Sequence, residues 1–386
     1  MRKLLAILLV VLLTPFIWLF FSKPTFEHLP SSPVPLSVQK FSEIKTPFRH
    51  KWREPSHPFT GAAVLDIDGD GRLEIFVGGG HGQEDMLLVY QTGALVDISK
   101  GKGLSDIAHA THGMASADMD GDGDVDLVVA RENGLTLYIN EAGSFSGQKI
   151  PLTLSKDAVP LSVAVSDVNN DGLPDLYVSV FVSFAAFKSA TFNNPEHAKK
   201  NVMLINQGDN KFADETAQTG TEGLNNTFHS VFADLNRDGK MELVLSQNTG
   251  EIEIFTPAEQ GRYRSLATRS GYGFWMGLAV ADFDRDGDED IFVSNVGTSI
   301  PDFLTKGDLK KDQRHNTGWG LFETEEGLKL SDIASLANLH QMGFAWGAQF
   351  EDLNLDGEMD LIVAKNSIKW FLHKFAPLDG KALLQV

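Results

Sequence analysis

Six short segments of this sequence place carboxylate or amide side chains at alternate positions, a spacing that can surround a cation. Each begins with Asp, continues with Asp or Asn at position 3 and Asp at position 5, and returns to Asp or Glu at position 9. A backbone carbonyl at position 7 adds another oxygen. Hard oxygen ligands in this number favour Ca²⁺ over Zn²⁺ or copper, and the flexible geometry favours Ca²⁺ over Mg²⁺. The pattern therefore predicts up to six bound calcium ions.

The predicted ligands are the residues at positions 1, 3, 5 and 9 of these calcium loops. In chain order they are Asp66, Asp68, Asp70, Glu74, Asp118, Asp120, Asp122, Asp126, Asp167, Asn169, Asp171, Asp175, Asp234, Asn236, Asp238, Glu242, Asp282, Asp284, Asp286, Asp290, Asp352, Asn354, Asp356 and Asp360. One such segment alone could be a solvated turn, because Asp, Asn and Gly all favour turns. Six copies in one register, each with glycine at position 6 where the chain must bend sharply, favour the ligand interpretation.

The elements around the loops read as strands. The first loop lies between "AAVL" and "EIFV", and position 12 holds an apolar residue such as Val77 instead of the bidentate Glu of a helical calcium motif. Copies recur about every 50 residues, with two longer intervals, and four short strands fit each repeat. We therefore predict an all-β fold, a β-propeller with about six recognisable four-stranded blades. Either residues 38–60 close a ring of six or seven blades with the C-terminal strands, or the chain stops short of a seventh blade.

The N-terminal region predicts export. Basic Arg2 and Lys3 precede an uncharged apolar run at 4–21, which is long enough to span a bilayer with the rest of the chain outside. Residues 1–21 are thus predicted to be a signal anchor or transmembrane helix, with a cleaved signal peptide as the alternative. A proline-rich linker at 22–37 follows, and the propeller is predicted over 38–386. The domain would then be periplasmic or extracellular, either anchored in the cytoplasmic membrane or secreted.

Composition excludes several functions. The chain has 386 residues, a formal net charge of -19 and no cysteine. Such an acidic chain is a poor partner for nucleic acid, whose phosphates attract Lys and Arg. The absence of cysteine excludes disulfides, thiolate metal sites and a cysteine nucleophile.

The loops and their flanks resemble the FG-GAP/VCBS repeat β-propellers, in which such loops join the first two strands of a blade, as in the integrin α-subunit head. The phrases "NVMLINQGDNKFADETAQTG" and "WMGLAVADFDRDGDEDIFVSN" are similar to the ASPIC/UnbV type, related to cartilage acidic protein. The resemblance covers roughly residues 55 to 370. It implies a calcium-containing propeller, although this family usually carries a further C-terminal module and seven blades.

Residues just before the loops are candidates for lining a central channel. They are His112, His229, Trp275, Met276 and Trp346, with Met114 and Met342 beside them. A His and Met cluster could hold copper or a small ligand, whereas packing between blades is the simpler interpretation. Two insertions, 181–201 and 297–316, concentrate aromatic residues and lysines, and long loops on a rigid scaffold commonly carry binding.

Two functional hypotheses follow. The first is a non-catalytic, calcium-stabilised binding, adhesion or scaffolding module with a protein or glycan partner outside the cytoplasm. The second is a propeller enzyme that acts on a polysaccharide or another ligand in the channel. An enzyme would need an acid and a base converging on one pocket, whereas most acids here are committed to the loops. No nucleophile elbow, zinc motif or dinucleotide fingerprint is present.

Overall fold

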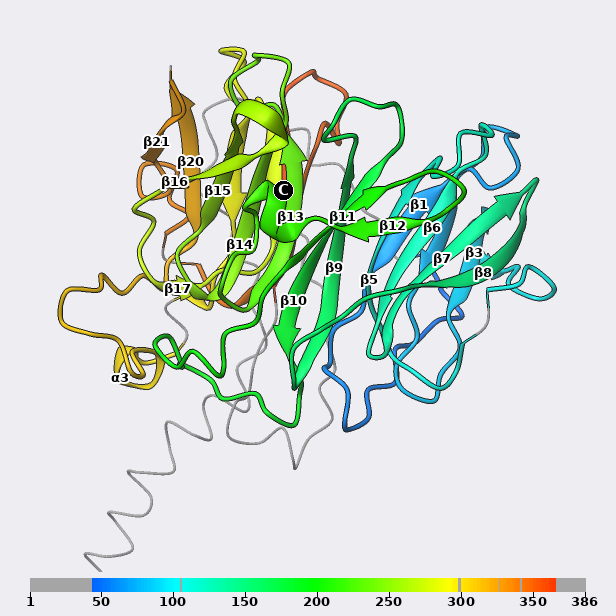
Figure 1. Cartoon of the computed structure of the whole chain (residues 1–386), viewed down its shortest axis with the longest axis horizontal. Helices are drawn as coiled ribbons and strands as arrows, with labels where there is room; N and C mark the ends of the chain where they lie inside the picture. Colours follow the sequence, from blue (N-terminus) through cyan, green and yellow to red (C-terminus); the bar gives the residue numbers. More distant parts are fainter. Residues whose placement is uncertain (1–43, 105, 298–299, 326, 341, 366–386) are drawn as a thin grey trace, which may run out of the picture.

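The computed structural model describes residues 44–365, except 105, 298–299, 326 and 341. Over these residues the chain forms a series of antiparallel sheets that stand side by side in chain order (Figure 1). The predicted anchor at 1–21 and linker at 22–37 lie outside the described residues. Within the described part of the chain, no helix has the length and apolar character needed to cross a membrane.

The first three sheets have four strands each, ordered as in the sequence. The first contains β1 (Ala62–Leu65), β2 (Glu74–Val77), β3 (Met86–Gln91) and β4 (Ala94–Asp97). The second contains β5 (Thr111–Ala117), β6 (Asp126–Arg131), β7 (Gly134–Glu141) and β8 (Ser144–Ile150). The third contains β9 (Ala158–Ser166), β10 (Asp175–Val182), β11 (Val202–Asn206) and β12 (Phe212–Asp214).

The remaining sheets continue the series. The fourth contains β13 (Thr227–Ala233), β14 (Glu242–Gly250), β15 (Glu253–Pro257) and β16 (Tyr263–Ala267), with the short β17 (Gly273–Phe274) paired to β14. The fifth contains β18 (Leu278–Ala281), β19 (Asp290–Val293), β20 (Gly320–Glu325) and β21 (Lys329–Asp332). The sixth contains β22 (Ala345–Glu351) and β23 (Asp360–Lys365). Helical segments are short: α2 (Thr216–Thr219), η1 (Glu259–Gly261) and α3 (Asp302–Thr305).

The hydrophobic core lies between neighbouring sheets. Strands such as β6 and β10 are buried along their whole length, because apolar side chains on both faces meet an adjoining sheet. Leu137 of the second sheet and Leu176 of the third belong to one cluster, and Tyr177 of the third sheet shares the next cluster with Leu243 of the fourth. Sheets stacked face to face in this way are consistent with the predicted propeller.

The first and last sheets also come together. The ring of Phe59, just before β1, lies 5.0 Å from the ring of Trp346 in β22, centroid to centroid. Phe228 of β13 contacts both rings. These contacts between the first, fourth and sixth sheets gather the starts of their first strands around one central region.

The all-β prediction is confirmed, whereas the number of blades and the closure of the ring stay predictions. Four of the six sheets have four strands, the fourth has five because the short β17 joins it, and the sixth has two among the described residues. Residues 44–60, the described part of the segment expected to close the ring, contain no strand. The backbone N–H of Leu95 in the first sheet donates to the carbonyl of Lys45 at 3.2 Å, whereas His57 contacts the carbonyl of Val182 in the third sheet.

Candidate metal centres and a second cavity

Every calcium loop joins the first strand of a sheet to the second. The position 9 acid is always the first residue of that second strand: Glu74, Asp126, Asp175, Glu242, Asp290 and Asp360. The first strands of successive sheets contact one another, so all six loops leave the same ends of these neighbouring strands. The strand pairs therefore fix each loop at both of its ends.

Hydrogen bonds within the loops orient the first carboxylate. In the second loop Asp118 accepts backbone N–H groups from Gly121 at 2.7 Å, Asp122 at 3.2 Å and Gly123 at 3.0 Å. The position 1 aspartates of the first, third, fourth and sixth loops likewise accept from positions 5 and 6. These hydrogen bonds hold the loop backbone around one carboxylate.

Two residues of each loop have left-handed backbone angles. Position 6 is always glycine, with φ between 82° in Gly71 and 109° in Gly287. Position 4 also has positive φ. In three loops this position holds a bulky residue in place of glycine: Arg237, Arg285 and Leu355. A bulky side chain in this conformation costs about 1–2 kcal/mol.

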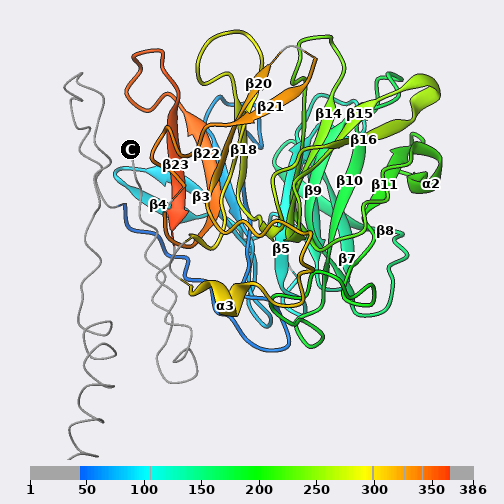
Figure 2. The same ribbon diagram turned by 90° about the vertical axis from the view of Figure 1, so that its left-hand side faces the viewer.

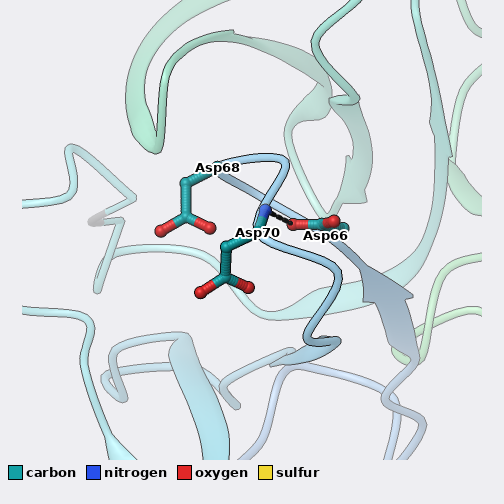
Figure 3. A group of neighbouring side chains, drawn as sticks. All are labelled: Asp66, Asp68 and Asp70. Carbon is teal, nitrogen blue, oxygen red and sulfur yellow. Dashed lines mark hydrogen bonds between the residues drawn. The ribbon is translucent and has the colours of Figure 1, made fainter.

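Three loops bring three carboxylates close enough to share one cation. The groups are Asp66 with Asp68 and Asp70, Asp118 with Asp120 and Asp122, and Asp282 with Asp284 and Asp290. In each group one oxygen from every residue lies within 4.8 Å of the others. Figure 3 shows the first group around its turn, with the backbone N–H of Asp70 donating to Asp66 at 3.2 Å.

The fifth loop carries the clearest sign of a missing partner. Oδ1 of Asp282 is buried and has no hydrogen-bond partner among the described residues, while Oδ2 accepts from Arg237 of the preceding loop at 2.9 Å. A buried carboxylate oxygen without a partner is costly. A cation between Asp282, Asp284 and Asp290 would satisfy it, so the residues present fit a calcium ion.

The position 9 acids are buried beneath the loops in the first five copies, and Asp360 in the sixth is half-buried. Asp126 accepts backbone N–H groups from Met119 and Asn140, both at 2.8 Å, so it ties the loop to β7. Burial, followed by the nearby loop carboxylates Asp120 and Asp122, raises the pKa of Asp126 to about 6. The same two causes, burial first, raise the pKa of Glu242 to about 7 and the pKa of Asp290 to about 6. A bound cation would offset this repulsion.

The other three loops have Asn at position 3. Their amide oxygens accept the backbone N–H of position 5, as in Asn169 to Asp171 at 3.0 Å and Asn354 to Asp356 at 2.8 Å. Asn236 does the same for Asp238 at 3.0 Å. Each of these loops therefore has one carboxylate fewer among its predicted ligands. In the first loop Arg72 competes with a cation for Asp70, because its Nε donates to that carboxylate at 2.8 Å. We infer that the six loops differ in calcium affinity.

The residues predicted to line a central channel lie in different environments. Trp275 and Met276 are fully buried in packing between sheets, and Trp275 donates its indole N–H to the carbonyl of Gly271 at 3.1 Å. They therefore lie in the core and not on a solvent-accessible wall. Trp346 is half-buried against Phe344, and His229 in β13 is exposed. His112, at the start of β5, is buried.

His112 instead lines a cavity that sequence reasoning missed. The cavity, about 330 Å³ in volume, is surrounded by Pro55, His57, His81, His109, His112, Glu132, Val159, Ser183, Phe184 and Ala185. These residues lie at the opposite ends of β5, β6 and β10 from the calcium loops. No periodic signal links them, because they come from six segments that only the tertiary fold brings together.

The two insertions dock onto each other. The carboxylate of Asp308 accepts the backbone N–H groups of Phe192 at 2.6 Å and Asn193 at 3.2 Å, and Asn193 also donates to Gln313 at 2.8 Å. The helix α3 in the second insertion lies at the lower left of the ribbon in Figure 1 and below the sheets in Figure 2. Its Phe303 is 78% exposed. The insertions thus form one continuous surface on the side of the cavity.

Comparisons with known proteins agree with the repeat pattern. A family model described as FG-GAP-like repeat matches residues 66–129, 118–178 and 234–293. Cartilage acidic protein 1 of Xenopus tropicalis is 27% identical over 275 residues, which are 62% of this chain and 40% of that protein. Human integrin alpha-8 is 25% identical over 327 residues, 72% of this chain and 30% of that protein. This chain therefore spans less than half the length of these relatives.

Among solved structures, an Agrocybe aegerita lectin that recognises non-reducing terminal N-acetylglucosamine aligns with a TM-score of 0.43. The two share 14% sequence identity, and the alignment covers 72% of this chain and 65% of the lectin.

Proposed function

We propose that this chain, which contains FG-GAP-like repeats, is an exported calcium-binding β-propeller that binds a protein or glycan partner without catalysing a reaction. The observation that carries the proposal is the gathering of carboxylates in loops that join the first two strands of each sheet. The calcium ions stabilise the scaffold, and the scaffold presents a recognition surface. In this proposal the apolar run at 4–21 anchors the propeller in the cytoplasmic membrane with its domain outside, or directs secretion if it is cleaved.

Calcium stabilises the fold through charge. Positions 1, 3 and 5 of each loop carry two or three acidic side chains, and the position 9 acid adds another beneath them. Without a cation these groups repel one another, and burial opposes ionisation of the acid at position 9. A ligand that binds only the folded state stabilises that state by mass action. Affinities on the order of 10⁻⁴ to 10⁻³ M per loop are expected for an extracellular module.

Recognition is assigned to the side of the molecule opposite the calcium loops. There the docked insertions offer an exposed Phe303 and a surface held together by Asp308. Loops mounted on a rigid scaffold are well suited to partner binding. The calcium loops and this surface would then have separate roles, stability on one side and recognition on the other.

Calcium stoichiometry with thermal melting tests the proposal on the full-length chain. Close to six bound ions, and a large fall in Tm on chelation, are expected. Fewer than three ions together with an unchanged melt in chelator would mean that the loops are simple turns, and the proposed calcium role would be abandoned.

A further inference from the structure

The cavity at His112 has a defined pattern of hydrogen-bonding groups. Nε2 of His57 lies 2.7 Å from the carbonyl oxygen of Val182, and Nδ1 of His112 lies 3.1 Å from the carbonyl oxygen of Pro160. A carbonyl only accepts, so each of these nitrogens must carry the proton. The opposite nitrogens, Nδ1 of His57 and Nε2 of His112, are therefore left with free lone pairs when the rings are neutral.

Both rings are held in the neutral form. Burial lowers the pKa of His57 to about 4, although the bond to Val182 and the charge of Glu132 oppose the shift and His112 reinforces it. Burial also lowers the pKa of His112. Nε2 of His112 is buried and has no hydrogen-bond partner among the described residues. An unsatisfied buried lone pair on a cavity wall calls for a donor.

Glu132 adds a further acceptor to the cavity, whose other polar lining residues are His81, His109 and Ser183. Glu132 is held by the hydroxyl of Ser56, by Nδ1 of His81 at 3.1 Å and by the backbone N–H of Ala110 at 3.1 Å. The lining residues include no Lys or Arg. An anionic ligand would therefore meet a carboxylate without a fixed cation, whereas a donor-rich ligand would satisfy the acceptors.

The walls and the spacing favour an organic ligand over a single metal ion. Among the described residues, the only sets of three His or acidic ligand atoms within 4.8 Å of one another lie in the calcium loops. A volume of about 330 Å³ is typical of a small-molecule site. Phe184 forms part of the wall, and the 37% exposed ring of Trp52 packs edge-on against it at 5.7 Å.

We propose that this cavity binds a neutral, hydroxyl-rich ligand, the ring of a sugar. Its hydroxyl groups donate to Nε2 of His112 and Nδ1 of His57, while its apolar face rests on Phe184. This deepens the proposed binding function and rests on it, since it assigns the glycan partner to one site. The site is independent of the calcium loops at the other ends of the strands.

Binding of methyl glycosides to the calcium-loaded full-length chain tests the inference. Methyl galactoside, mannoside, glucoside and N-acetylglucosaminide are titrated at millimolar concentration by calorimetry and ligand-observed NMR. At least one should bind, and His112→Phe, which keeps the ring but removes the lone pair, should weaken it about tenfold or more. Phe184→Ala, at the half-buried wall, should weaken it as well and provides a second variant if His112→Phe folds poorly. Glu141→Ala, at an exposed strand end, serves as the control.

Two results would overturn the sugar site. One is the absence of binding by all four glycosides, or equal affinity in the control and in both cavity variants. The other is stoichiometric Zn²⁺ binding that disappears in His112→Phe, which would assign the cavity to a metal. Counting calcium in the same samples separates the two proposals. A full ion count without sugar binding rejects only the sugar site, whereas a low ion count rejects the proposed calcium role.

Discussion

The guanidinium of Arg131 at the end of β6 donates to the carboxylate of Asp85, and both side chains are completely enclosed by protein. Arg131 also donates to the hydroxyl groups of Thr111 and, at 3.0 Å, Tyr138. Asp85 accepts the backbone N–H of Gly79 at 2.7 Å. This network joins the first sheet to the second directly behind Glu132 of the cavity. The two charged groups share one hydrogen bond, and Thr111, Tyr138 and Gly79 supply further partners, although Nε of Arg131 has no hydrogen-bond partner among the described residues. Such additional hydrogen bonds offset part of the cost of burying opposite charges.

Removing one member of this pair should be strongly destabilising. Arg131→Met leaves the Asp85 carboxylate buried without its cation and should lower the free energy of unfolding by about 3–5 kcal/mol. Denaturant unfolding of the calcium-loaded protein measures this. The double variant Arg131→Met with Asp85→Leu removes both charges and should recover part of the loss. A single variant as stable as the parent would show that the pair contributes little.

Loss of one calcium ligand should remove one ion. Asp118→Ala deletes a carboxylate that belongs to the cluster of the second loop, so the ion count should fall by one. If the loop's affinity falls tenfold, the calcium-dependent gain in stability falls by up to about 1.4 kcal/mol. For each protein, the unfolding free energy is measured with and without chelator, and the two differences are compared. This is necessary because Asp118 also accepts loop N–H groups, so its loss destabilises the calcium-free form as well. Glu141→Ala should keep both the ion count and this difference, and an unchanged count in Asp118→Ala would contradict the ligand assignment.

Backbone strain in the sixth loop offers a stabilising substitution. Leu355 has φ of 59° and is 88% exposed, whereas Asn170 occupies the same loop position in the third loop with φ of 58°. Asn tolerates this conformation better than Leu, so Leu355→Asn should raise the free energy of unfolding by about 0.5–1 kcal/mol. Gly357→Ala in the same loop, where φ is 85°, should lower it by about 1 kcal/mol. Thermal melts that rank these two variants the other way would refute the strain argument.

His57 should make stability fall in acid. Its native pKa is about 4, below the ordinary value of 6.5, so the unfolded chain takes up the proton first. The stability that a neutral His57 contributes is therefore complete above pH 6.5 and is lost as the pH falls towards 4. The full effect is roughly 3 kcal/mol. Unfolding free energies at pH 7 and pH 4.5 should differ less in His57→Gln than in the parent, and an identical pH dependence would contradict the assignment. The position 9 acids have raised pKa values, so their contribution to stability changes with pH in the opposite direction. This contribution is the same in both proteins and cancels in the comparison.

Asp308 should hold the two insertions together. Asp308→Ala removes the acceptor for the backbone N–H groups of Phe192 and Asn193, so these amides should exchange with solvent faster, by about tenfold for a loss near 1.4 kcal/mol. Hydrogen exchange measured by mass spectrometry over residues 188–196 reports this. Asp312→Ala, a nearby exposed acid in the same insertion, is the matched control. Equal exchange in the two variants would show that the insertions are held by other contacts.

Sequence alone predicted the repeat, the six acidic loops and their place between two strands, because these features are local. Loop position 9 falls on the first residue of a strand in every copy, as expected for a short turn that enters an apolar run. It also predicted the all-β class, since apolar runs bounded by Gly, Asn and Asp recur throughout. The burial of the position 9 acid was not predicted, because burial depends on which sheet covers the loop.

The contacts between distant segments could not be predicted, because they depend on how the sheets pack. Arg237 reaches Asp282 in the next loop, Phe192 meets Asp308 across more than a hundred residues, and His57 approaches Val182. The sequence spacing of these pairs follows no repeat. Sheets that stack side by side bring residues together by their position along the strands and not by their distance along the chain. The cavity at His112 is of this kind, and so His112 could be singled out in the sequence while its neighbours His57 and Glu132 could not. The conformation of a calcium loop depends on a few neighbouring residues, so it can be predicted from the sequence. A site built from several sheets forms only when those sheets pack together.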